Sequence, residues 1–414
     1  MPTHPQINAH DRLVLRRLAG KVADLAARPI EDEKRDLWYR HNALQATRPL
    51  IFCDPENGWN EILTPEQLEC EGDLARGWEW HFRQEIFWGA EMNDDRVVEP
   101  YFDVGYEAEV SDWGMHESRR GGEAGGSYVW DAPLADFADM DNLRFPSVTI
   151  DRAKTGEMRA LAEQTFGDLL TVRVKQGWFW SFGLTLTLVN LRGLEQIMWD
   201  MVDHPEELHR LMAFLSDGTA AFLDGLEAEG VLSLNNDGSY VGSGGFGWSH
   251  ELPQADFTGR VRLRDRWGFA ESQETVAIGP DMFAEFVFPY QLPLLERFGL
   301  NCYGCCEPLD KRWHVVKRAP RLRRVSVSAW ADLEFMADAL KGDYVFSWKP
   351  NPSHLAMPTF DEELIRNTLR DGFRKGKGCC MEAIMKDCHT IGGDARRATE
   401  WVRIAKEEAE GTGS

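Results

Sequence analysis

The sequence lacks long apolar runs, and none reaches the roughly 18–20 residues that a membrane-spanning helix needs. Residues 1–18, MPTHPQINAHDRLVLRRL, also lack the apolar stretch of a secretory signal. Positive charge is scarce: 46 lysines and arginines against 68 acidic residues give a formal net charge of −22. Such a chain repels nucleic acid and anionic membranes. These absences predict a cytoplasmic protein with no nucleic-acid or membrane partner.

Internal repeats and low-complexity segments are also missing. The cysteines, by contrast, are clustered, since the segment NCYGCCEPLD (301–310) holds Cys302, Cys305 and Cys306, three of the eight in the chain. Disulfides are not expected, because a reducing cytoplasm keeps thiols free. Clustered cysteines in such a compartment more often bind metal or do chemistry, although cysteine also packs cores. Metal binding or catalysis is the favoured interpretation, with core packing as the alternative.

From about residue 165 the sequence alternates between strand-like and helix-like segments. The expected strands are 169–175, 231–238, 300–304, 322–330, 343–350 and 379–387. The expected helices are 203–230, 279–299, 309–319, 332–342, 359–376 and 394–410. This alternation predicts βαβ units and a parallel sheet. Two further strands upstream would close an eight-stranded barrel.

The predicted fold class is therefore α/β, a (β/α)8 TIM barrel over residues 151–414 with an N-terminal helical and irregular extension, 1–150. The extension has helices within 11–45 and a possible first strand at 48–54, where RPLIFCDP ends in an Asp-Pro turn. Residues 85–150, rich in Gly, Asp and aromatics, are expected to be irregular or β. A doubly wound open sheet is the alternative, but no GxGxxG motif follows the first strand.

Active sites of such barrels lie at the C-terminal ends of the strands. The candidates at those ends are Gln176, Trp178, Asn235, Asn236, Asp237, Cys302, Cys305, Cys306, Glu307, Trp330, Lys349, Asn351, Asp387, Cys388 and His389. Thiolates with an imidazole or carboxylate suit zinc. Zinc also lowers the pKa of a bound thiol and makes it a nucleophile near neutral pH. The cysteine cluster and KDCHT (386–390) thus predict one metal site at a common barrel mouth.

Plainer roles compete with several of these interpretations. Four cysteines are interpreted as core residues: Cys53, Cys70, Cys379 and Cys380. Asp237 follows two asparagines and could be a turn residue, and His389 could be a loop histidine. The segment GSGGFGW (242–248) is interpreted as a flexible active-site loop, because no strand leads closely into it and no clear helix follows.

Four segments resemble the uroporphyrinogen decarboxylase superfamily: HPEELHRLMAFLSD, the strand ending in NNDG, GPDMFAEFVFPYQLPLLERFGL and CYGCCEPLDKRW. The resemblance covers about residues 165–405, with a weaker match in 37–62. It implies a (β/α)8 barrel, in agreement with the alternation. True uroporphyrinogen decarboxylases use no metal and hold substrate carboxylates with an Arg-Gln-Ala-Gly-Arg-Tyr-type motif, which this sequence lacks.

The sequence is more similar to the branch of corrinoid-linked methyltransferases and cobalamin-independent methionine synthase. Those enzymes bind zinc through His-x-Cys at one strand end and a later Cys near the last strand. By position, Cys302 replaces the histidine, Cys305 or Cys306 matches the first cysteine, and Cys388 matches the late one. Further ligand candidates are Glu307 and His389. The resemblance implies zinc or another soft divalent metal, and a corrinoid on a partner protein.

The sequence thus predicts a metal-dependent methyltransferase or demethylase, moving a methyl group between a small-molecule substrate and a thiol or corrinoid carrier. Asp237 would orient a cationic or hydroxyl group, Lys349 would pair with an anionic group, and Glu307 is a third catalytic candidate. The predicted substrate contacts are Gln176, Trp178, Trp180, Asn235, Trp248, Trp267, Tyr303 and Trp330. An aromatic wall would be formed by four of the tryptophans: Trp178, Trp180, Trp248 and Trp267.

Two other functions stay open. A metal-free decarboxylase or lyase would aim arginines at the barrel mouth and stay active after chelation. A non-catalytic partner that docks a corrinoid protein would bind without turnover. A homodimer is compatible with either function and with methyl transfer.

Overall fold

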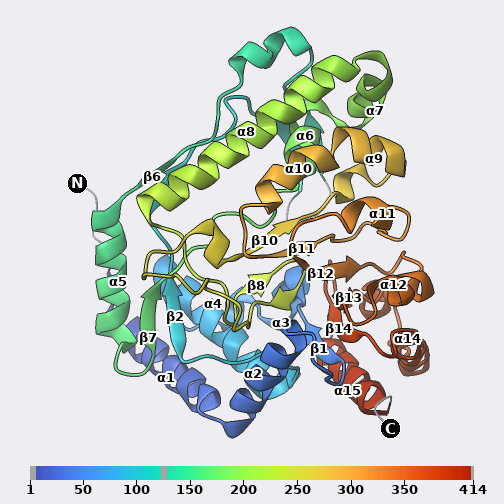
Figure 1. Ribbon diagram of the computed structural model, residues 1–414. Coiled ribbons are helices and arrows are strands. Elements are labelled where there is room, and N and C mark those ends of the chain that lie inside the picture. The colour runs from blue at the N-terminus through green and yellow to red at the C-terminus, as the bar shows by residue number, and fades with distance from the viewer. Residues whose placement is uncertain (1–5, 123–127, 412–414) are drawn as a thin grey trace.

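The computed structural model describes residues 6–122 and 128–411, and its main feature is a six-stranded parallel sheet (Figure 1). The strand order is β1 (Leu50–Cys53), β14 (Cys380–Met385), β13 (Val345–Trp348), β12 (Leu322–Val327), β11 (Leu300–Tyr303) and β10 (Trp267–Ala270). Apart from one residue of β12, every side chain in these strands is buried. Both faces are therefore covered, as is usual for parallel sheets.

Helices connect these strands and cover the sheet. Those in this half of the chain are α9 (Pro280–Phe286), α10 (Phe288–Leu295), α11 (Trp313–Val316), α12 (Leu333–Leu340), α13 (Ser353–Ala356), α14 (Glu362–Lys375) and α15 (Arg396–Gly411). α14 packs on α15, and α15 contacts β1. The last helix therefore closes over the first strand of the sheet.

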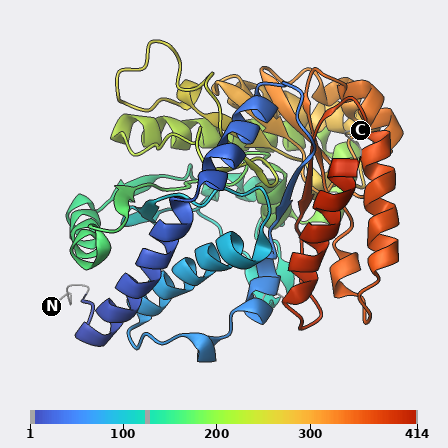
Figure 2. The same cartoon turned by 90° about the horizontal axis from the view of Figure 1, so that it is seen from below.

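A second, smaller unit lies beside the sheet. β2 (Tyr101–Val104) and β7 (Thr171–Val174) form a parallel pair, and α1 (Ala9–Ala26), α4 (Asp73–Phe87) and α5 (Arg152–Phe166) pack around it. Their apolar side chains form a core of their own, built around Phe82, Phe102 and Phe166. Figure 2 shows α1 and α4 on the side of the molecule away from α14 and α15. The β2–β7 ladder crosses residue 150, the boundary predicted from the sequence.

The remaining elements connect these two units. The helices are α2 (Pro29–Asn42), α3 (Trp59–Ile62), α6 (Thr185–Arg192), α7 (Leu194–Asp203) and α8 (Pro205–Glu229). Three antiparallel pairs join β3 (Ala108–Val110) to β6 (Val148–Ile150), β4 (Ser118–Gly121) to β5 (Tyr128–Asp131), and β8 (Tyr240–Val241) to β9 (Gly245–Phe246). The β8–β9 hairpin corrects the interpretation of 242–248 as a flexible loop, since every residue of that segment is buried.

The predicted strands are mostly confirmed, and β1 confirms the possible strand at 48–54. Five of the later strands are also confirmed, by β7, β11, β12, β13 and β14. A strand at 231–238 is wrong, because no ladder forms there. Instead, the Asn235 side chain donates to the Trp267 carbonyl at 3.1 Å and accepts from the Trp267 N–H at 2.9 Å. Side-chain hydrogen bonds thus take the place of backbone pairing beside β10.

Two predicted helices are shorter than expected. The helix expected at 279–299 divides between α9 and α10 at Val287, just before Pro289, which has no N–H to continue the helix. The helix expected at 309–319 is reduced to the single turn of α11. Among the residues that the structure describes, no helix is both long and apolar enough to cross a bilayer.

The two sheets together establish an α/β fold with a parallel central sheet. In the described part of the chain no ladder joins β2 and β7 to the six-stranded sheet, so the closed eight-stranded barrel stays a prediction.

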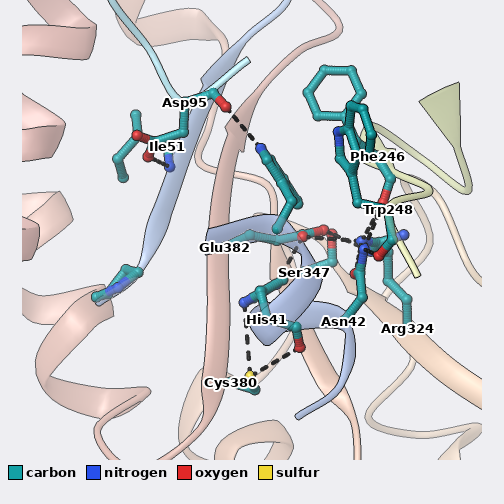
Figure 3. A network of polar contacts seen from close by, with 12 residues as sticks. His41, Asn42, Ile51, Asp95, Phe246, Trp248, Arg324, Ser347, Cys380 and Glu382 are labelled. Atoms are coloured by element: carbon teal, nitrogen blue, oxygen red, sulfur yellow. Dashed lines mark hydrogen bonds and ion pairs between the residues drawn. The ribbon is translucent and has the colours of Figure 1, made fainter. Parts of the chain in front are cut away.

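A buried network of charged and polar side chains joins β12, β13 and β14 to α2 (Figure 3). Glu382 of β14 accepts hydrogen bonds from Ser347 of β13 and, at 3.0 Å, pairs with both Arg324 of β12 and His41 of α2. Arg324 also donates to the Asn42 side chain at 2.6 Å. Burial alone would lower the pKa of His41, but its bonds to Cys380 and Glu382 raise that pKa to about 9.

We expect the stability to depend on pH through His41. Its folded-state pKa lies above the ordinary value of 6.5, so its contribution is complete below pH 6.5 and is lost as pH rises through about 9. Measured by urea denaturation, the free energy of unfolding of the wild type should fall by about 3 kcal/mol over this pH window relative to that of His41→Asn. Equal pH slopes for the two proteins would contradict the assignment.

Candidate functional site

The ends of β11 and β14 bring two chemically active loops together. The first carries Cys305 and Cys306, and the second carries Lys386 and Asp387. The turn between β11 and Cys305 needs glycine, because Gly304 has φ +91° and a Cβ there would lie 2.5 Å from Leu309 Cδ1. The C-terminal ends of the parallel strands lie at one edge of the sheet, so the two loops meet there although β12 and β13 separate β11 from β14, and residues 81 positions apart make contact.

The two loops enclose a cavity of about 380 Å³, here named the thiol cavity. Its lining includes Glu56, Trp180, Tyr240, Cys305, Lys386 and Asp387. Asp54 and Gln273 complete the lining, which therefore combines one thiol, one ammonium and three carboxylates with aromatic walls.

Cys305 and Cys306 form a thiol pair, with 3.5 Å between the two sulfur atoms. Ser243 Oγ donates to Cys305 Sγ at 3.2 Å, and Cys306 Sγ donates to Asp387 Oδ2 at 3.2 Å. The contact with Cys306 lowers the pKa of Cys305, and Lys386 adds to this effect against burial. The same contact, burial and the Asp387 carboxylate raise the pKa of Cys306. Cys305 is therefore the thiol of the pair that ionises more readily, and the S–H of Cys306 is directed to Asp387.

Lys386 is held against the thiol pair by two carboxylates. Its Nζ lies 3.3 Å from Glu56 Oε1 and 3.2 Å from Asp387 Oδ1. Burial would lower the pKa of Lys386, but nearby Tyr240, Cys305, Asp387 and Glu56 raise it well above its ordinary value. Lys386 is thus a fixed positive charge at the cavity wall.

We expect Cys305 to be alkylated as a thiolate at neutral pH. Iodoacetamide labelling, read at Cys305 by peptide mass spectrometry, should have its half-maximal rate below the usual thiol pKa of about 8.5. Lys386→Met should slow labelling at pH 7 by about 10-fold, a shift of about one pKa unit. The exposed Lys377→Met is the matched control and should leave the rate unchanged. Unchanged labelling in Lys386→Met would exclude a role for Lys386 in ionising the thiol.

Glu307 stabilises the loop that carries Cys305 and Cys306. Its carboxylate accepts from the Cys305 N–H and from the Ser272 N–H, both at 2.8 Å. Burial raises the pKa of Glu307 against these hydrogen bonds. The side chain is fully enclosed and belongs to neither cavity lining, so it positions Cys305 rather than contacting a substrate.

A larger cavity of about 510 Å³ lies between β10 and the β2–β7 pair, and is here named the large cavity. Trp180 and Tyr240 line both cavities, so the two adjoin. The predicted residues Gln176, Asn235 and Trp267 line the large cavity, which supports their placement. Gln176 accepts from the Tyr106 N–H at 3.2 Å, so part of its polar side chain is already engaged.

Asp237 lies beside the large cavity in an ion-pair network. Its Oδ2 accepts from Lys175 Nζ at 2.6 Å and lies 3.4 Å from Arg173. Burial opposes ionisation, but Lys175 and Ser239 lower the pKa of Asp237. The neighbouring Glu99 lines the cavity, and burial with the Asp237 charge raises its pKa to about 7. Asp237 neutralises a cavity-lining lysine, a role the sequence did not indicate.

Lys349 lies beneath the thiol cavity and not in it. Its Nζ donates to the Ser347 carbonyl at 3.0 Å and to Ser347 Oγ at 2.5 Å. Burial lowers the pKa of Lys349 to about 8. It contributes charge near Cys305 and Glu382, but it is absent from both cavity linings.

Four predicted aromatic contacts lie away from both cavities. Trp178 donates to the Val231 carbonyl at 3.0 Å, and Trp248 is buried in a core cluster under α2. Tyr303 donates to Gln291 of α10 at 2.6 Å, so it faces outward from the sheet. Trp330 is 71% exposed at the surface. These four positions correct the predicted substrate contacts, and of the predicted aromatic wall only Trp180 and Trp267 line a cavity among those described.

The structure places the predicted metal ligands in different parts of the molecule. Cys302 faces Arg324 inside the sheet, 3.8 Å from its Nη1. Cys388 packs in the main core and donates to the Lys386 carbonyl at 3.7 Å, while His389 is exposed. In the described residues no hydrogen bond links any of these three to Cys305 or Cys306. The predicted five-residue ligand set is therefore reduced to the thiol pair.

Over residues 6–122 and 128–411, no group of three or more His, Cys, Asp or Glu side chains is arranged to hold a metal. The Cys305–Cys306 pair has a spacing that suits two metal ligands. Two thiolates on one tetrahedral zinc, each about 2.3 Å from it, lie roughly 3.7 Å apart. The observed 3.5 Å fits two such ligands, with the other positions left to water or substrate.

Sequence reasoning missed several site residues. Asp387 was among the candidates at the strand ends, and Lys386, the residue before it in the predicted strand 379–387, could have been found from the same position. Ser243 and Tyr240 come from the β8–β9 hairpin, whose glycine-rich sequence resembles a loop. Arg266, which lines the large cavity, gives no signal in the charged run RVRLRDRW.

No protein-family model matches the sequence, and the search of curated proteins gives no match.

Proposed function

We propose that the fold is a (β/α)8 barrel built from β1, β2, β7 and β10 to β14. From β10 to β14 the strands lie in chain order, and β1 then lies beside β14, the last strand. A closed barrel brings its first and last strands together in this way, whereas a doubly wound sheet reverses its order at a switch point. Contacts at the open edges support closure: Asn235 binds beside β10, and Asp95 N–H donates to Ile51 of β1 at 2.8 Å.

We propose that the protein is an enzyme that moves a methyl group between a small substrate and a thiol or corrinoid carrier, assisted by a soft divalent metal such as zinc. The observation that carries this proposal is the Cys305–Cys306 pair at the cavity, with its sulfur atoms 3.5 Å apart. One thiol has a lowered pKa, and nucleophilic sulfur reacts as the thiolate.

Each neighbouring residue has a defined part in this proposal. Cys305 and Cys306 would hold the metal, which when bound favours the thiolate form of its ligands and of a bound thiol. Lys386 stabilises negative charge on sulfur, and Ser243 orients Cys305. Glu307 fixes the Cys305 backbone, and Trp180 with Tyr240 narrows access of water.

A methyl-transfer assay tests the proposal. Purified protein supplied with zinc, free methylcobalamin and a small thiol should consume the cobalt-bound methyl, followed by absorbance, and form the methyl thioether. The chelator 1,10-phenanthroline should stop the reaction, and restored zinc should recover it. Chelator-resistant turnover, or release of CO₂ from a carboxylic acid without methyl transfer, would favour the metal-free decarboxylase instead.

The decarboxylase remains the second candidate because one specific observation favours it. That function predicts arginines aimed into the site, and Arg266 lines the large cavity. Decarboxylation does not by itself explain a paired thiolate at the cavity wall, so methyl transfer accounts for more of the geometry.

A further inference from the structure

Arg266 is a buried arginine that forms no ion pair with any residue in the described ranges 6–122 and 128–411. It precedes β10, lines the large cavity and is only 6% exposed. Its Nε and Nη1 atoms are buried and have no hydrogen-bond partner. Burying an unpaired cation is costly, so such groups are normally paired. Burial alone lowers the pKa of Arg266 to about 10, and no carboxylate offsets that effect.

The other lysines and arginines of the same lining are paired, which singles Arg266 out. Arg96 binds Glu85 with two hydrogen bonds. Arg173 binds Asp103 at 2.6 and 2.8 Å. Lys175 binds Asp237 at 2.6 Å. Among the described lysines and arginines of this lining, Arg266 is therefore the one left for a ligand.

The surroundings of Arg266 indicate the shape of that ligand. Its guanidinium carbon lies 5.5 Å from the centre of the Phe179 ring, so an aromatic side chain lies beside the charge. A guanidinium binds a carboxylate through two parallel hydrogen bonds. Trp180 and Phe269, whose rings pack edge to face 5.1 Å apart, give the cavity an apolar wall.

We propose that the large cavity binds a small organic monocarboxylate, with its carboxylate on Arg266 and its apolar part against Trp180 and Phe269. The single unpaired guanidinium of Arg266 matches a monoanion better than a phosphate dianion. Because Trp180 also lines the thiol cavity, the far end of the ligand would point toward Cys305. As a binding site the proposal stands alone; as the substrate class of the methyl transfer it rests on the proposed function.

Calorimetric titration with phenylacetate, an aromatic monocarboxylate, tests the site. Arg266→Met should weaken phenylacetate binding by roughly 10- to 100-fold, as expected for loss of charge-assisted hydrogen bonds. The neutral 2-phenylethanol should bind wild type and variant alike. Arg264→Met is the matched control, since it removes an exposed arginine two residues away that pairs with Asp256, and it should bind phenylacetate as wild type does.

The Arg266→Met variant should fold, because the substitution removes an uncompensated buried charge, and its melting temperature should not fall. The zinc content of Arg266→Met should equal that of the wild type. A failure of the carboxylate site would therefore show in phenylacetate affinity, whereas a failure of the metal proposal would show in zinc content. Equal phenylacetate affinity in wild type and Arg266→Met, or no carboxylate binding by wild type, would overturn the site. Tighter binding of phenyl phosphate than of phenylacetate would overturn the ligand class.

Discussion

Cys305→Ser is expected to lose zinc, with an affinity more than about 100-fold below that of the wild type, because loss of even an outer-shell partner costs 10- to 100-fold. Serine keeps the size of the side chain but offers a hard oxygen that suits zinc poorly. Competition with a colorimetric zinc chelator measures the change. Methyl transfer should fall with the metal, while circular dichroism should show the fold retained.

Two control cysteines make this experiment discriminating. Cys379→Ser alters a half-buried thiol that contacts the Ala337 carbonyl and should bind zinc as the wild type does. Cys302→Ser should also keep its zinc, although its position in the sequence suggested a ligand, because its sulfur faces Arg324 inside the sheet. Zinc loss in Cys302→Ser, or its retention in Cys305→Ser, would count against the thiol pair as the metal site.

Glu382→Gln is expected to reduce the free energy of unfolding by about 3–5 kcal/mol, the usual cost of removing one member of a buried ion pair. Glu382 is fully buried, and its carboxylate is the common partner of Arg324 and His41 (Figure 3). Their charges depress the pKa of Glu382 far below its ordinary value despite burial. Urea denaturation at pH 7 measures the loss.

A surface pair on the neighbouring residue provides the control. Arg323 binds Glu251 with two hydrogen bonds, but Glu251 is half exposed. Glu251→Gln should therefore cost less than about 1 kcal/mol. In the double variant Arg324→Met/Glu382→Leu, stability should partly return, because no unpaired arginine is left behind. A loss in Glu382→Gln no larger than that in Glu251→Gln would contradict the role of the network.

The alternation of strands and helices was readable because the buried strands are short apolar runs bounded by polar helices. β10 escaped notice because WGFA follows directly on the charged run RVRLRDR, which hides the start of the strand. The segment 231–238 misled in the opposite direction, since its apolar start resembles a strand but its amides bind the edge of β10. Backbone pairing depends on neighbours distant in sequence, which a local pattern does not contain.

The sequence indicated which candidate residues lie at strand ends but not which way their side chains point. Successive strand residues point to opposite faces, so Cys302 faces inward to Arg324 while Tyr303 faces α10. The sequence alone does not fix which residue faces which way. Beyond β14, Asp387 adopts φ +60°, and the chain then carries Cys388 into the core. This local turn separates two residues that sequence position had placed in one ligand set.

Zinc K-edge X-ray absorption on the zinc-loaded protein tests the central claim most directly. The thiol-pair assignment predicts two sulfur neighbours at about 2.3 Å, with nitrogen or oxygen atoms in the remaining positions. In Cys306→Ser the number of sulfur neighbours should fall to one. A zinc surrounded only by nitrogen and oxygen would contradict the assignment.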